Sequence, residues 1–90
     1  MDLKQLKYFV TVAEEGTISA AAKKLFMSQP PLSIQMKLLE QELGCPLFER
    51  GQKHIRLTDT GKLLYDRAQN ILKMEASMRQ DIEACSRTEK

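Results

Sequence analysis

Residues 21–33 read AAKKLFMSQPPLS, and this stretch decides the fold. Its first half belongs to a short helix that Thr17 can cap. The buried stripe of that helix is small and apolar: Ile18, Ala21, Ala22 and Leu25. The second half starts another helix at Ser28, where Pro30 and Pro31 are tolerated because first-turn N–H groups have no partner within a helix. Apolar residues recur at spacings of 4, 3 and 4 and give this helix its buried face, before Gly44 ends it: Leu32, Met36, Leu39 and Leu43. The pattern predicts two helices joined by a tight turn near 26–27.

The tip of the helix at 28–43 lacks the usual local hydrogen bonds. The Ser28 hydroxyl would normally accept from the N–H of the second or third helical residue, and Pro30 and Pro31 have no N–H. Pro30 also favours an extended Gln29. We expect the tip and the side opposite the leucines to face outward, with these residues on it: Ser28, Gln29, Pro30, Ser33, Ile34 and Lys37. A merely solvated polar face would show the same periodicity.

The chemistry of this outward side suits DNA. An α-helix fits the major groove of B-DNA with its N-terminal residues at the base edges. Gln29 can pair bidentately with adenine, Ser33 can reach a base or a phosphate, and Lys37 suits a phosphate or guanine. Pro30 and Pro31 offer rigid apolar surface for a thymine methyl group.

The flanking segments add a third helix and a wing. One apolar face predicts a helix over 3–15 that ends at Gly16: Leu3, Leu6, Phe9, Val10 and Ala13. Two short strands are expected at 47–50 and 55–58. The Gly-containing connection between them is typical of a hairpin. The basic residues of this hairpin are Arg50, Lys53, His54 and Arg56. A basic tip can reach the minor groove or phosphates beside a recognition helix, and an ordinary solvated turn is the alternative.

A long final helix is predicted from Thr58, its cap, to about Cys85, a length of roughly 40 Å. Its apolar residues follow a 4–3 heptad pattern that Glu75 interrupts: Leu64, Ala68, Ile71, Met78, Ile82 and Cys85. We assign this stripe to dimerisation with a second copy. Cover from within the chain, or from a domain outside it, is the alternative.

These elements predict a mainly α fold, in which a winged helix-turn-helix of three helices and a two-stranded wing (1–58) precedes a linker or dimerisation helix (59–90). Positive charge concentrates in the middle of the chain: residues 23–62 hold seven Lys and Arg against four acidic residues. Two cysteines, taken as small apolar residues, and one histidine cannot complete a four-ligand zinc site, so no metal is expected. No apolar run is long enough to span a membrane, and the chain begins without a signal peptide, so we expect a cytoplasmic protein.

The sequence resembles the LysR-type transcriptional regulators, first in the stretch 21–33. The resemblance continues in Leu39-Glu40, in Glu42-Leu43-Gly44, in Pro46-Leu47-Phe48-Glu49-Arg50 and in Leu57-Thr58-Asp59-Thr60-Gly61, and it includes 3–9 and 12–14. It implies a bacterial homo-oligomer whose final helix pairs antiparallel with its mate, with higher oligomers in the full-length protein. It implies that a small-molecule effector binds a C-terminal domain absent from this chain. It also implies that these residues touch DNA: Gln29, Pro30, Pro31, Ser33 and Lys53.

One position departs from the family pattern. The family often carries a DNA-reading arginine between Ser33 and Gln35, and this chain has Ile34. Isoleucine cannot bond to guanine or neutralise a phosphate, but it can pack on a thymine methyl group. We therefore expect a half-site more tolerant of A·T and a weaker salt dependence of binding.

Two other functions compete with DNA binding. A winged helix used for protein–protein contact would not need the polar tip at Ser28-Gln29-Pro30. An enzyme would have to use the sole His54 on an exposed turn, without a Gly-rich phosphate loop. We therefore expect no catalytic residues and no cofactor, and double-stranded DNA with an interrupted palindromic site as the partner.

Overall fold

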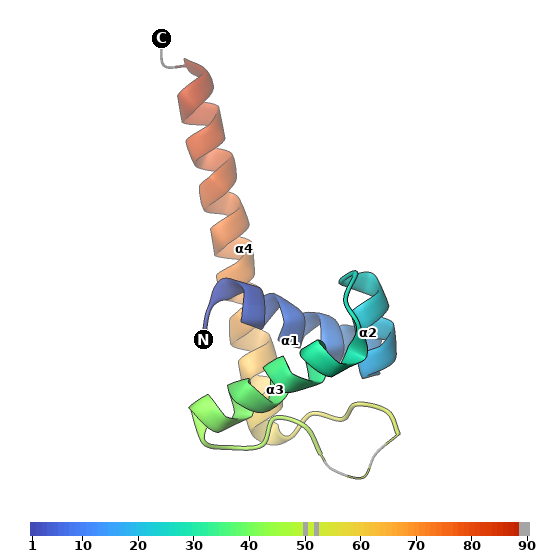
Figure 1. The fold of residues 1–90 in the computed structure, drawn as a ribbon. Coiled ribbons are helices and arrows are strands. Elements are labelled where there is room, and N and C mark those ends of the chain that lie inside the picture. Colours follow the sequence, from blue (N-terminus) through green and yellow to red (C-terminus); the bar gives the residue numbers. More distant parts are fainter. Residues whose placement is uncertain (50, 52, 89–90) are drawn as a thin grey trace.

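The computed structural model of the chain describes residues 1–49, 51 and 53–88. These residues form four helices, of which three lie in a small head and the long fourth helix projects from that head (Figure 1). The first helix, α1 (Leu3–Glu15), packs against the other three helices and is the centre of the head. Asp2 caps it by accepting a hydrogen bond from the Gln5 nitrogen at 2.7 Å. Gly16 ends it in the left-handed region, at φ 82°, as the sequence predicted.

The buried face of α1 is shifted from the predicted one. Leu6, Phe9 and Val10 are buried as expected. Val12 is also fully buried, whereas Leu3 is 42% exposed. A helix that packs against three neighbours buries more than one stripe, and its first residue lies beyond their cover.

The second helix, α2 (Ile18–Lys24), begins at Thr17, whose hydroxyl accepts from the Ala20 nitrogen at 3.1 Å. This confirms the predicted cap. The helix ends earlier than the predicted 26–27, because Phe26 adopts a left-handed conformation with φ 56° and turns the chain toward α3. The Phe26 side chain is 97% exposed.

The third helix, α3 (Gln29–Leu43), ends at Gly44 with φ 73°, as expected. Leu32, Met36 and Leu39 are buried against α1 and α2. The prediction that Leu43 is buried is wrong, because it is 38% exposed. Figure 1 shows this last turn of α3 at the edge of the head.

The segment after α3 forms the wing, which is less regular than two four-residue strands. Its pairing among the described residues is one antiparallel bridge between Phe48 and Leu57. Backbone hydrogen bonds extend the pairing on either side, from Glu49 to Arg56 at 2.8 Å and from Thr58 to Leu47 at 3.0 Å. The Ile55 nitrogen donates instead to the Gly16 carbonyl at 2.7 Å. That bond draws the second strand toward the α1–α2 turn and shortens the ladder.

The last helix, α4 (Asp59–Thr88), runs past the predicted end at Cys85 and is about 45 Å long. The Thr58 hydroxyl caps it by accepting from the Gly61 nitrogen at 3.0 Å. Its first turns belong to the head, because Ala68 is fully buried in the core and Leu64 and Leu72 pack against that core. The C-terminal part of the helix projects away from the other elements (Figure 1).

Candidate nucleic-acid interface

The side of α3 that carries Leu32, Met36 and Leu39 is anchored in the core, with exposed fractions of 0%, 3% and 0%. Gln5 of α1 adds a polar tie, because its side-chain nitrogen donates to the Gln35 carbonyl oxygen at 3.3 Å. Because one side of α3 is held in this way, its opposite side faces solvent as a rigid surface.

The N-terminal tip of α3 is uncovered. Ser28 is extended, with φ −83° and ψ 162°, and its side chain makes no cap hydrogen bond, as the two prolines required. Gln29 is the first residue of the helix, so the expectation that it is extended is wrong. The packing of α3 overrides the local preference that Pro30 imposes. Every side chain from Ser28 to Pro31 is exposed.

The outer side of α3 continues from this tip. Lys37 is exposed and Ile34 is 56% exposed. Ser33 is half-buried, since it lines a groove between α3 and the wing together with Lys37 and Phe48. Leu38, which is 47% exposed, was not predicted to lie on this side. Its spacing of four residues from Ile34 was the signal that could have found it.

The wing presents basic side chains beside α3. Lys53, His54 and Arg56 are exposed, and Ile55 and Leu57 are half-buried, which is the alternation typical of a strand with one covered face. The Arg56 guanidinium lies 3.7 Å from Glu49, so part of its charge is offset. The predicted Arg50 lies outside the described residues.

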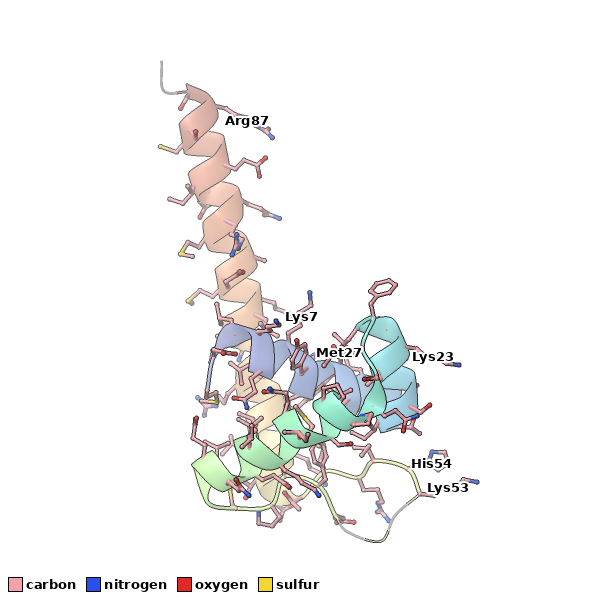
Figure 2. All side chains as sticks on the ribbon, viewed as in Figure 1. Lys7, Lys23, Met27, Lys53, His54 and Arg87 are labelled. Carbon is pink, nitrogen blue, oxygen red and sulfur yellow. The ribbon has the colours of Figure 1, made fainter. Side chains whose placement is uncertain are left out.

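Lys23 adds a cation that the sequence reasoning did not single out. Figure 2 shows Lys23, Lys53 and His54 extending from the same side of the molecule. Lys23 is exposed at the end of α2, close in sequence to the tip of α3. The side that holds the tip of α3 is therefore flanked by positive charge from two different elements.

The wing is held to α3 by one carboxylate. The Oε2 atom of Glu40 accepts from the backbone nitrogens of Leu47, at 2.7 Å, and Phe48, at 3.3 Å. The Phe48 ring also packs on Phe9 of α1, with 5.5 Å between ring centroids. The wing and α3 are thus fixed relative to each other, which a surface that fits one duplex requires.

The predicted dimerisation stripe on α4 divides into two parts. Leu64 is half-buried and Ala68 fully buried inside the chain's own head, so the assignment of Ala68 to a partner contact needs correction. Ile71, Met78 and Ile82 are 44%, 56% and 66% exposed. Met74, which the predicted heptad pattern did not include, is 75% exposed and adds to the exposed apolar residues of α4. Cys85 is exposed as well.

Within the described part of the chain, no cluster of three or more His, Cys, Asp or Glu side chains is arranged to hold a metal ion. No helix there combines the length and apolarity needed to cross a membrane.

Known proteins are similar to this chain in sequence and in fold. Residues 3–62 match the model of the family described as "Bacterial regulatory helix-turn-helix protein, lysR family". The HTH-type transcriptional regulator BsdA of Bacillus subtilis (strain 168) is 53% identical over 73 residues, which are 80% of this chain and 25% of that protein. The HTH-type transcriptional regulator ClcR of Pseudomonas putida is 44% identical over 89 residues, which are 99% of this chain and 30% of that protein.

A solved structure matches nearly the whole chain. The crystal structure of the BenM_DBD/benA site 1 DNA complex superposes with a TM-score of 0.96 at 38% identity, covering 99% of this chain and 100% of that one. The chain spans only 25% and 30% of the two regulators above, which are named as transcriptional regulators rather than enzymes. By its sequence match over two thirds of its length and by its fold, the chain belongs to the LysR family of bacterial regulatory helix-turn-helix proteins.

Proposed function

We propose that this chain binds double-stranded DNA sequence-specifically as part of a dimeric bacterial transcriptional regulator. The observation that carries the proposal is the contrast along α3: Leu32, Met36 and Leu39 are buried on one side, while the tip from Ser28 to Pro31 is exposed and has no side-chain cap. In this proposal α3 enters the major groove and the basic wing lies at the flanking minor groove. The likeness to a DNA-binding domain solved on DNA supports it.

The proposed contacts follow from side-chain chemistry. Gln29 bonds to a base edge, adenine being its bidentate partner, and Ser33 reaches a base or a phosphate from the groove beside the wing. Pro30 and Pro31 give apolar contact, and Lys37 binds a phosphate or guanine. The wing residues Arg50, Lys53 and His54 neutralise or approach the flanking phosphates.

The proposed dimer uses the projecting part of α4. Ile71, Met78 and Ile82 form an exposed apolar stripe that a second α4 would cover. Two copies would place their α3 helices one turn of DNA apart, or a multiple of it, on an interrupted palindrome. We extend the proposal to a longer cytoplasmic protein in which a further domain binds a small-molecule effector and higher oligomers form.

Selection of preferred duplexes from a random pool tests this proposal, because it returns the half-site and the spacing together. On the selected duplex, Gln29→Ala should cost about 1–3 kcal/mol and relax preference at one base pair. Lys53→Ala should weaken all sequences alike and lower the slope of log affinity against log salt by about one.

Lys73→Ala is the matched control, because Lys73 is exposed on α4 away from the proposed interface. It should leave binding to the selected half-site unchanged. Unaltered duplex binding in both Gln29→Ala and Lys53→Ala would argue instead for a winged helix that contacts protein.

A further inference from the structure

The outer side of α3 carries more apolar than charged surface. Ile34 and Leu38 are 56% and 47% exposed, and Pro30 and Pro31 are exposed at the tip. We call these four residues the apolar ridge. Positions three and four residues apart are neighbours on a helix, so Ile34 is adjacent to the other three positions of the ridge. Its remaining neighbour on this side, Lys37, is the only charged one.

None of the four ridge residues belongs to the core cluster of the head or to the hydrophobic residues packed against that cluster. The ridge lies on the side of α3 opposite Leu32 and Met36, which are buried against α1 and α2. Ile34 is also β-branched, so its side chain is stiff and loses little rotamer freedom on contact. A stiff apolar group at the centre of an exposed helix face is suited to a small apolar partner.

We propose that Ile34 is a specificity-determining residue that packs on the 5-methyl group of a thymine in the major groove of the half-site. This inference rests on the proposed DNA-binding function. Thymine alone among the four bases presents a methyl group in that groove, and the other positions there are hydrogen-bond donors and acceptors, which Ile34 cannot pair. The half-site therefore contains a thymine within the base pairs that α3 covers.

The contact has its own salt behaviour. Packing on a methyl group neutralises no phosphate, so the preference that Ile34 confers should stay constant as salt rises, while overall affinity falls. The contribution of Lys37, one turn further along α3, should instead fall as salt rises, because a phosphate contact is salt-dependent.

Replacement of thymine by deoxyuridine tests the proposal, because it removes only the 5-methyl group and keeps the base pair. Each thymine of the selected half-site is replaced in turn, and the affinity of the whole 90-residue chain is measured. At one thymine the loss should be about fourfold, the value for burying one methyl-sized group. Ile34→Ala should bind the thymine and deoxyuridine duplexes equally.

Lys37→Ala is the matched control from the same face. It should bind both duplexes more weakly and keep the fourfold preference for thymine. Ile34→Arg should lose the preference for that thymine and steepen the salt slope by about one. Thermal melting of each variant shows whether the exposed substitution leaves the fold intact.

Two results would overturn the proposal: wild-type affinity that no deoxyuridine changes, or an Ile34→Ala variant that keeps the wild-type preference for thymine. Either result leaves the proposed function standing, since the chain still selects a duplex. A wild-type chain that selects no duplex would instead contradict both this proposal and the proposed DNA-binding function.

Discussion

The Oε2 atom of Glu40 lies 2.7 Å from the backbone nitrogen of Leu47, and this contact ties α3 to the wing. The same oxygen accepts from the Phe48 nitrogen at 3.3 Å. Both N–H groups lie at the start of the wing, and no backbone carbonyl of the described residues accepts a hydrogen bond from either. One side chain thus joins the two parts of the proposed interface.

Glu40→Ala should destabilise the chain by about 1–3 kcal/mol, because two N–H groups that are partly shielded from water lose their acceptor. It should also weaken duplex binding without changing which bases are preferred. Urea unfolding and binding titrations measure the two effects. Gln41→Ala, an exposed neighbour on α3, is the control and should leave the unfolding midpoint in place. If Glu40→Ala and the wild type unfold at the same urea midpoint, the Glu40 carboxylate does not stabilise the fold.

Gly61 is buried at a close backbone contact, where α4 meets the segment after α3. A Cβ atom at this position would collide with the carbonyl oxygen of Leu47. Gly61→Ala should therefore destabilise the chain by about 1–3 kcal/mol, although Ala is favoured over Gly by about 1 kcal/mol in an open helix. Thermal melting decides the sign. Thr60→Ala, exposed in the same turn, controls for changes in helix propensity.

Phe26 combines a left-handed backbone with a side chain that is 97% exposed. A bulky residue is strained at φ 56°, and asparagine tolerates this region better. Phe26→Asn should raise stability by about 0.5–1 kcal/mol, measured by urea unfolding. Phe26→Val is the paired test, because a β-branched residue fits the turn worse and should lower stability. A Phe26→Asn variant that is less stable than wild type would contradict this prediction and show that the phenyl ring contributes to folding.

The sequence predicted the helices well because their ends depend on local chemistry. Two helices begin after a capping threonine, Thr17 or Thr58, and two helices end at a glycine, Gly16 or Gly44. The exposed tip of α3 was also predictable, since two adjacent prolines remove the cap bonds that Ser28 would make.

Other features depended on tertiary contacts that periodicity does not encode. Ala68 has the spacing of a dimer stripe, yet it is fully buried in the core of the same chain. The wing is shortened by the bond between Ile55 and Gly16, two residues far apart in sequence. Nothing in the local sequence of Glu40 shows that it is bonded to the wing.

Tyr65 joins α4 to α1 through its hydroxyl, which donates to Glu14 at 3.0 Å. Burial raises the pKa of Tyr65 above its usual value of 10.0, and the hydrogen bond and the negative charge of Glu14 raise it further. A raised pKa means that the contact stabilises the fold fully below about pH 10 and that this contribution is lost as the pH rises through the pKa of the folded state.

Tyr65→Phe should therefore cost up to about 1 kcal/mol at pH 7, because the half-exposed hydrogen bond is lost. Its deficit against wild type should shrink once the pH passes about 10. Urea unfolding across pH 7–11 follows this change. Tyr8→Phe is the control, since no hydrogen bond joins the Tyr8 hydroxyl to another described residue. A deficit that stays constant with pH would rule out the link to ionisation.

The exposed stripe on α4 leads to a prediction about assembly. Met78 lies at its centre, 56% exposed, between Met74 and Ile82, which are 75% and 66% exposed. Met78→Lys places a charge where the partner helix would pack and should shift the chain from dimer to monomer, measured by sedimentation equilibrium. Gln80→Lys adds the same charge on the opposite side of α4 and should leave the dimer intact.

The same pair of variants connects assembly to DNA binding. A dimer binds two half-sites together, so the linked second site raises its affinity well above that for one half-site. Met78→Lys should lose this advantage on a selected palindrome and keep its affinity for a single half-site, because α3 and the wing are unchanged. Gln80→Lys should keep both. If Met78→Lys and Gln80→Lys show the same mass and the same advantage for the palindrome, the exposed stripe is not the surface that pairs two copies.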